Sequence, residues 1–266
     1  MAANPRRTFH YHANAHVLSG RFTRPIQHLI EVQGASSLPT IGGHGKAHVE
    51  DFRLGHFVSV KRGYTHVSGS LQEKDEKTYH TTLVTSVAEG VNILDVITAD
   101  RIVGRFASSF SFDDNDTEPQ FTFVGSKFEN LQIAGCGTKI ELNFDLFEKI
   151  PTFEDAIKEF KKRPELGKIA DEALEVDGRA SDQKPHGAIL CSIVDVKKLE
   201  TDCPGLKRKG HCLLIPKFGK LFLGEILMQH GRRTLTMLRF ELGSPISGDG
   251  TIVQLDSNGQ PWPPSR

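Results

Sequence analysis

The sequence has no net charge and no long apolar run, and these absences exclude several classes of protein. Lys plus Arg and Asp plus Glu each number 33 in the 266 residues. Proteins that bind nucleic acid through its phosphates carry a basic excess, so no nucleic-acid partner is expected. No stretch approaches the ~18 apolar residues of a membrane span, so none is predicted. Arg6 and Arg7 precede no apolar signal-peptide core, which predicts a cytoplasmic protein.

Cysteine is scarce, and the common catalytic motifs are missing. The cysteines are Cys136, Cys191, Cys203 and Cys212, and no two form a C-x-x-C pair. That spacing excludes a zinc ribbon and a thioredoxin-type motif. Buried thiols are the expectation, and a disulfide such as Cys203 with Cys212 would need an oxidising compartment. There is no G-x-S-x-G, no Walker A motif and no G-x-G-x-x-G after a strand, so no cofactor is assigned.

Over much of the chain, apolar and polar residues alternate with a period of two, which is the period of a β-strand. In residues 8–18 an apolar set alternates with histidines and an asparagine, which is typical of a half-buried strand. Similar runs, rich in Val, Ile, Phe and Thr and separated by turn residues, predict many short strands. These runs are 52–60, 78–87, 91–97, 101–112, 120–128, 131–133, 138–147, 188–196, 211–215, 220–228 and 234–242.

One segment changes to helical spacing. Thr152 is a suitable N-cap with acidic residues after it, and Phe153, Ile157 and Phe160 fall on one helical stripe. Pro164 ends this helix, and a second short helix is predicted over 164–175. Residues 179–184 are predicted to form a loop. The sequence therefore predicts one helical insertion near 152–176 in a mainly β protein.

Internal similarity suggests a repeat of about 40 residues. Thr82, Val84, Ser86, Glu89 and Ile93 recur at an offset of 40 as Thr122, Val124, Ser126, Glu129 and Ile133, and a related segment begins at Glu50. We therefore predict that segments near 50, 89 and 129 occupy equivalent positions in an antiparallel β-repeat. Spacing alone leaves a sandwich, a barrel and a prism-like scaffold open.

Histidine is concentrated near the N-terminus and supplies the main candidate metal ligands. On an extended strand His10, His12 and His16 point to one face, and neutral imidazole is a common metal ligand. His44, His48 and Glu50 share a face of another predicted strand. If the two strands are neighbours, these six residues can form a metal site; otherwise the histidines are solvated. Basic clusters at 207–209 and 232–233 are expected at solvated turns.

These observations predict four regions: a β-rich 1–150, a helical 151–180, a β-rich 181–256 that completes the same fold, and an extended tail 257–266. The leading hypothesis is a non-enzymatic binding or self-assembling β-repeat protein, because nucleophile motifs are missing and many strand edges need covering. Its partners would be an unidentified small-molecule or protein ligand, or a second copy in a homo-oligomer. The alternative is a metal-dependent enzyme that uses the histidine cluster, with Glu50 or Glu31 as base.

Overall fold

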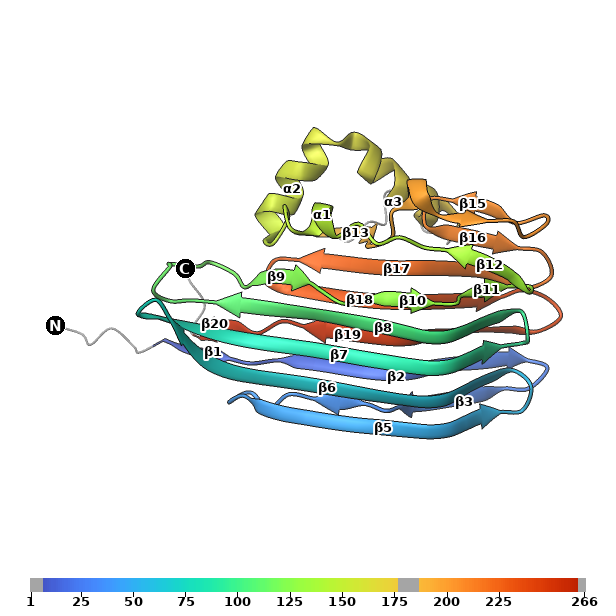
Figure 1. Cartoon of the computed structure of the whole chain (residues 1–266), viewed down its shortest axis with the longest axis horizontal. Coiled ribbons are helices and arrows are strands. Elements are labelled where there is room, and N and C mark those ends of the chain that lie inside the picture. The colour runs from blue at the N-terminus through green and yellow to red at the C-terminus, as the bar shows by residue number, and fades with distance from the viewer. Residues whose placement is uncertain (1–6, 177–186, 263–266) are drawn as a thin grey trace.

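The structure is a computed structural model that describes residues 7–176 and 187–262. It contains 60 % strand and 12 % helix. Two antiparallel sheets pack face to face as a sandwich, and the helices lie together at one side of it (Figure 1). The predicted fold class, a mainly β antiparallel scaffold with a helical insertion, is confirmed, and the sandwich is the arrangement adopted.

The first sheet, sheet I, has the strand order β14-β12-β11-β8-β7-β6-β5, and β9 and β10 also pair with β8. Its strands are β5 (Gly43–Leu54), β6 (Val58–Lys74), β7 (Lys77–Ile93), β8 (Ile97–Phe110), β9 (Gln120–Phe123), β10 (Lys127–Glu129), β11 (Gln132–Ile133), β12 (Cys136–Lys139) and β14 (Glu200–Thr201). The long β6–β7 hairpin turns at Asp75 and Glu76, which both have positive φ. Two positive φ values give the turn whose twist matches a two-residue hairpin.

The second sheet, sheet II, has the order β15-β16-β17-β18-β19-β2-β3, with β13 on β17 and β4 on β2. Its strands are β2 (Ala13–Arg24), β3 (His28–Gln33), β4 (Ser36–Ser37), β13 (Ala188–Ser192), β15 (Lys207–Lys209), β16 (Cys212–Ile215), β17 (Gly219–Gln229), β18 (Arg232–Leu242) and β19 (Ser247–Ser257). A separate ribbon joins β1 (Thr8–His10) to β20 (Gln260–Trp262). Part of the predicted C-terminal tail is therefore a strand, whereas residues 263–266 lie outside the described part.

The core lies between the sheets, where small residues of sheet I allow side chains of sheet II to approach. A Cβ at Gly104 would lie 2.4 Å from Leu255 Cδ1, and one at Gly63 would lie 2.5 Å from Val17 Cγ1. The buried Ser86 hydroxyl donates a hydrogen bond of 2.8 Å to the main-chain oxygen of His16 in the opposite sheet. The two sheets are thus held at close range by complementary shape and by a satisfied polar contact.

The helical insertion forms as the sequence predicts. The described helices are α1 (Phe144–Phe147), α2 (Phe153–Lys162) and α3 (Pro164–Val176), followed later by a 3-10 turn, Val196–Lys198. Thr152 Oγ1 accepts a hydrogen bond of 3.1 Å from the Asp155 N–H, as an N-cap does. Ala173 of α3 packs on Cys212 and Phe222, so this helix covers part of the outer face of sheet II. The predicted loop at 179–184 lies outside the described residues.

Several predicted strand limits were wrong. Residues 144–147 are helical rather than extended, because Asn143 Oδ1 accepts a hydrogen bond of 3.2 Å from the Leu146 N–H and starts a helix. The runs 52–60 and 91–97 are interrupted by hairpin turns, where Gly55, Leu94 and Asp95 have positive φ. Strand β19 was missed, because its first residues, Ser-Gly-Asp-Gly, have the composition of a turn.

The three glutamates of the predicted repeat lie in one row across sheet I. Glu50 is the cross-strand partner of Arg62, which is in turn opposite Glu89. Glu89 and Glu129 are both opposite Arg101. The residue after each glutamate has positive φ: 48° at Asp51, 61° at Gly90 and 50° at Asn130. The three glutamates thus lie level with one another in the sheet. That the segments are units of a repeat stays a prediction.

Candidate functional site

The first three candidate metal ligands follow the predicted alternation, with their apolar neighbours buried. His10 is exposed at the end of β1, and its ring stacks on Trp262 with 6.0 Å between the ring centroids. His12 is exposed after β1. His16 lies on the outer face of β2, where its Nε2 is hydrogen bonded to the hydroxyls of Ser19 at 3.1 Å and Thr251 at 3.2 Å. His16 is therefore engaged by hydroxyl groups.

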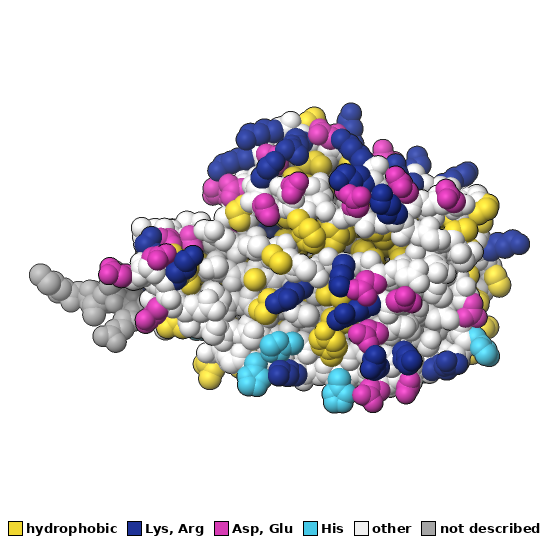
Figure 2. All heavy atoms as spheres, in the orientation of Figure 1, with side chains coloured by type: hydrophobic (Ala, Val, Ile, Leu, Met, Phe, Trp, Pro, Cys, Tyr) yellow, Lys and Arg dark blue, Asp and Glu magenta, His cyan; other side chains and the backbone are white. Residues whose placement is uncertain are grey.

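The other three candidates belong to the opposite sheet. His44, His48 and Glu50 lie on β5, the edge strand of sheet I, and all three are exposed. Figure 2 shows the outer face of this sheet, with histidine side chains along the edge where Figure 1 places β5. The structure does not bring the six residues together. Within residues 7–176 and 187–262, no group of three or more His, Cys, Asp or Glu side chains is placed to hold a metal ion.

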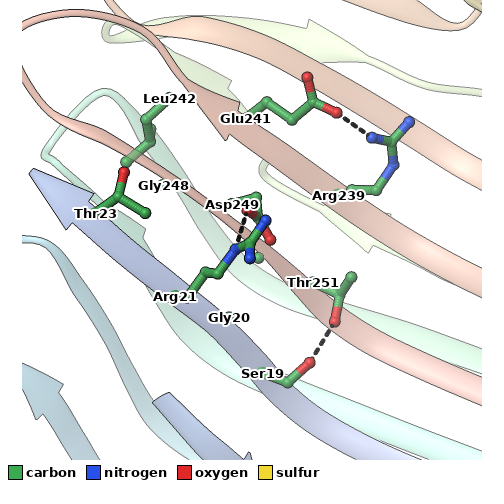
Figure 3. Close-up of a pocket in the computed structure, with 11 residues that line it drawn as sticks. Ser19, Gly20, Arg21, Thr23, Arg239, Glu241, Leu242, Gly248, Asp249 and Thr251 are labelled. Carbon is green, nitrogen blue, oxygen red and sulfur yellow. Dashed lines mark hydrogen bonds and ion pairs between the residues drawn. The ribbon is translucent and has the colours of Figure 1, made fainter. Parts of the chain in front are cut away.

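A polar concavity lies on the outer face of sheet II. It is an open groove of about 590 Å³ that crosses β18, β19 and β2 (Figure 3). Its polar lining includes Ser19 and Arg21 of β2, Arg239 and Glu241 of β18, and Asp249 and Thr251 of β19. These side chains point outward because their neighbours along each strand fill the core between the sheets.

One side of the groove is built by cross-strand pairs between β2 and β19. The Nε of Arg21 donates to Asp249 Oδ2 at 2.8 Å, and the hydroxyls of Ser19 and Thr251 are hydrogen bonded at 2.9 Å. The side chains of Arg21 and Asp249 are 65 % and 47 % exposed, so the remaining polar atoms of this pair face solvent. Next to them, burial lowers the pKa of His16 to about 4, which keeps its ring neutral at physiological pH.

The opposite side is a charged row on β17 and β18. Arg239 donates from Nε to Glu225 Oε2 at 2.6 Å and from Nη2 to Glu225 Oε1 at 3.0 Å. The same guanidinium donates to Glu241, which also accepts a hydrogen bond of 2.9 Å from Lys220. Figure 3 shows Arg239 and Glu241 facing each other at the groove wall. A bidentate pair of this kind fixes the guanidinium plane.

This charged row continues beneath α3, away from the groove. The fully buried His211 is hydrogen bonded through Nε2 to Glu225 Oε1 at 3.1 Å. Glu172 of α3 accepts a hydrogen bond of 3.0 Å from the Gly210 N–H, so the helix closes over this turn. Burial alone would raise the pKa of Glu225, but hydrogen bonds from His211 and Arg239 outweigh it and lower the pKa to about 2.

The buried cysteines Cys191 and Cys212 are unsuited to nucleophilic chemistry. Burial raises the pKa of the Cys191 and Cys212 thiols to about 12, so neither supplies a thiolate at neutral pH. The groove instead offers alternating donors and acceptors. Its two arginines and two carboxylates cancel in charge. It is therefore a neutral but strongly polar surface.

Sequence reasoning missed the charged residues of the groove. The alternation of residues 234–242 can place Arg239 and Glu241 on one face of a strand, but nothing local shows that β2 and β19 lie beside that strand. The expectation for the basic cluster at 232–233 was wrong in part. Arg233 is fully buried, with its guanidinium over the Phe121 ring at 4.7 Å and Nη1 donating to the Gln229 oxygen at 2.7 Å.

No helix in the described part of the chain is both long and apolar enough to span a membrane. No curated protein matches the chain, and no solved structure does. A protein family described as Domain of unknown function (DUF8256) matches residues 9–229. The match includes the β2 wall of the groove and ends before β18 and β19. Because it covers well over half of the 266 residues, the chain belongs to this family.

Proposed function

We propose that the protein is a binding protein whose groove on sheet II takes an uncharged, polyhydroxylated ligand such as an oligosaccharide. The observation that supports this is the charge-neutral array of paired donors and acceptors across β18, β19 and β2. A sugar hydroxyl both donates and accepts, so it is matched by a surface on which donors and acceptors lie side by side. The open shape suits a chain-like ligand that enters from the side.

The exposed Arg21–Asp249 pair is the expected main contact. Their mutual hydrogen bond uses one guanidinium N–H and one carboxylate oxygen. A guanidinium has five N–H donors and a carboxylate about four acceptor sites, so the pair can contact neighbouring hydroxyls while it stays intact. The hydroxyls of Ser19 and Thr251 form the next cross-strand pair on the same face, two residues further along the strands, and so extend the surface.

The groove is less suited to an anion. A phosphate or carboxylate ligand needs cationic groups that are not already neutralised. Here Asp249 lies against Arg21, while Glu241 and Glu225 lie against Arg239. An added anion would approach these carboxylates as well as the arginines. We therefore expect selection for neutral ligands over anionic ones.

Binding is expected to be weak. None of the described residues that line the groove is aromatic, so the stacking contribution of an aromatic platform is missing. We expect a Kd of roughly 0.1–1 mM, which corresponds to a favourable binding free energy of about 4–5.5 kcal/mol.

The test is titration calorimetry of the full chain with neutral cello-, xylo- and malto-oligosaccharides and with a sulfated oligosaccharide. We expect at least one neutral series to bind and the sulfated one to bind more weakly. Asp249→Asn should weaken binding at least fivefold, because a charged acceptor becomes a neutral amide. The matched control is Arg62→Gln, which changes the similarly exposed Arg62–Glu89 pair of sheet I and should bind as the wild type does. Failure of all neutral ligands, or equal loss in both variants, would overturn the proposal.

Self-association is a second candidate, supported by the edge of sheet I. Strand β5 pairs with β6 on one side, and no described strand pairs with its other side. Along this edge of 12 residues, alternate residues point main-chain groups away from β6, and a second copy can pair with them in antiparallel fashion. Light scattering over a range of concentrations should then show twice the chain mass of 29.5 kDa. A constant mass of one chain would contradict it.

A further inference from the structure

Two of the four cysteines face each other across the β12–β14 pair at the edge of sheet I. The antiparallel register pairs Thr138 with Thr201 and Lys139 with Glu200. Paired residue numbers in this ladder sum to 339, and continuing it by two residues places Cys136 opposite Cys203. The hydroxyls of Thr138 and Thr201 lie 3.4 Å apart. Because side chains alternate with period two, both cysteines lie on the face of the sheet that this threonine pair marks.

The hydrogen-bond pattern makes Cys136 and Cys203 a non-hydrogen-bonded pair, which is the antiparallel pair type with the shorter Cα–Cα distance. The Thr138 N–H donates to the Leu131 oxygen, toward β11, at 2.8 Å. Its main-chain polar groups therefore point away from β14, and those of Cys136, two residues away, point the same way. Opposite residues in such a non-hydrogen-bonded pair have Cα atoms about 4.5 Å apart, against about 5.5 Å in the other type. Disulfides span Cα separations of about 4.4–6.8 Å.

The two thiols are close enough to interact, and both are accessible. Both residues are partly exposed and are free thiols in this structure. Burial, together with a hydrogen bond and charge interaction with Cys136, raises the pKa of the Cys203 thiol. The other two cysteines, Cys191 and Cys212, are buried in the protein. The chain thus has one partly exposed pair of cysteines and two buried cysteines that serve as controls.

We propose that Cys136 and Cys203 form a reversible disulfide when they meet a thiol oxidant such as oxidised glutathione. One cysteine thiolate attacks a sulfur of oxidised glutathione and expels a glutathione thiolate, which leaves a mixed disulfide. The second cysteine thiolate attacks the protein sulfur of that mixed disulfide and expels the other glutathione. Two cysteine protons end on two reduced glutathione molecules, and the two electrons that the cysteines lose reduce the glutathione disulfide.

The bond would cross-link the sheet edge around the helical insertion. Residues 137–202, between the two cysteines, include α1, α2 and α3. Closing a loop of this length restricts the unfolded chain far more than the folded one, in which the cysteines are already neighbours. Oxidation should therefore raise the melting temperature by several degrees, and reduction should return it to the value of the untreated protein.

The experiment treats the full chain with oxidised glutathione, unfolds it, alkylates free thiols with iodoacetamide and measures the intact mass. The wild type has four cysteines, and we expect two of them to be alkylated, with peptide mapping that joins Cys136 to Cys203. Prior dithiothreitol should restore alkylation of all four. Thermal melts of the same samples give the second readout.

The variants decide which cysteines are involved. Cys136→Ser and Cys203→Ser should each abolish the intramolecular disulfide and the rise in melting temperature. Cys191→Ser, at a buried control position, should keep both. The proposal is overturned if the oxidised wild type still alkylates at four cysteines, if mapping finds another pair, or if either variant at 136 or 203 keeps the disulfide.

Discussion

The guanidinium of Arg239 lies directly over the ring of Phe222, with 3.6 Å between Cζ and the ring centroid. The two residues are cross-strand partners on β18 and β17. Phe222 also contributes to the apolar contact beneath α3. Arg239 therefore joins three features, the helical insertion, the buried Glu225 and the wall of the groove. Planar stacking and bidentate hydrogen bonding together are contacts that lysine cannot reproduce.

Replacing Arg239 should strongly destabilise the fold. Arg239→Gln would leave Glu225, whose side chain is 10 % exposed, without its main cationic partner. Loss of one member of a buried ion pair costs about 3–5 kcal/mol, and we expect a loss in that range. The measurement is the free energy of unfolding in urea. Arg21→Gln, in a pair exposed to solvent, is the control and should leave stability almost unchanged. Equal stability of the two variants would show that the buried pair contributes nothing.

The stability supplied by Glu225 should disappear in acid. Its pKa is about 2 in the folded protein, against about 4.3 for an unfolded chain. Its contribution is thus complete above about pH 4–5 and is lost as the pH falls toward 2. This difference in pKa corresponds to roughly 3 kcal/mol of folding stability supplied by the ionised carboxylate. Urea unfolding of the wild type and Glu225→Gln at pH 7, 5 and 3.5 should show a stability difference that narrows in acid. A constant difference would contradict the low pKa.

Local pattern accounts for much of this fold. The alternation around Phe9 and Val17 correctly predicted which side chains are buried, because a strand exposes its faces with period two. The cap at Thr152 correctly predicted where α2 begins, because a helix start depends on a few consecutive residues. The turn-like composition of β19 led to its omission from the predicted strands. Its pairing with β18 and β2 outweighs the preference of its glycines for turns.

The candidate site depended on non-local order that a single sequence does not contain. His16 and His44 were predicted to converge if their strands were neighbours, but β2 and β5 belong to different sheets. Arg21 meets Asp249, 228 residues later, because β19 pairs with β2 although the two strands lie near opposite ends of the sequence. Alternation predicts which face of the sheet a side chain lies on, but it does not predict which strands lie beside its own strand. The same limit hid the Cys136–Cys203 pair, because the sequence alone does not show that β12 and β14 are neighbours.

The core should not tolerate a methyl group at Gly104. A Cβ there would lie 2.4 Å from Leu255 Cδ1 and 2.7 Å from Val253 Cγ1. Overpacking of this kind costs about 1–3 kcal/mol, so Gly104→Ala should lower the free energy of unfolding by that amount. Gly137→Ala is the matched control, because nothing lies within 4 Å of a Cβ at that position. If both variants unfold at the wild-type urea concentration, the sheets are less closely packed at Gly104 than the structure indicates.

His16 should make the protein less stable as the pH falls below neutrality. Burial lowers its pKa from 6.5 to about 4 in the folded state, so between these values the unfolded chain binds a proton that the folded one excludes. Stability is therefore complete above about pH 6.5 and declines as the pH approaches 4, by up to roughly 3 kcal/mol. His16→Gln keeps a polar side chain beside Ser19 and Thr251 but does not titrate. Urea unfolding at pH 7.5, 6, 5 and 4.5 should give a flatter stability profile for this variant than for the wild type. His12→Gln, at an exposed position, should keep the wild-type slope. Identical slopes for all three proteins would show that burial does not hold His16 neutral.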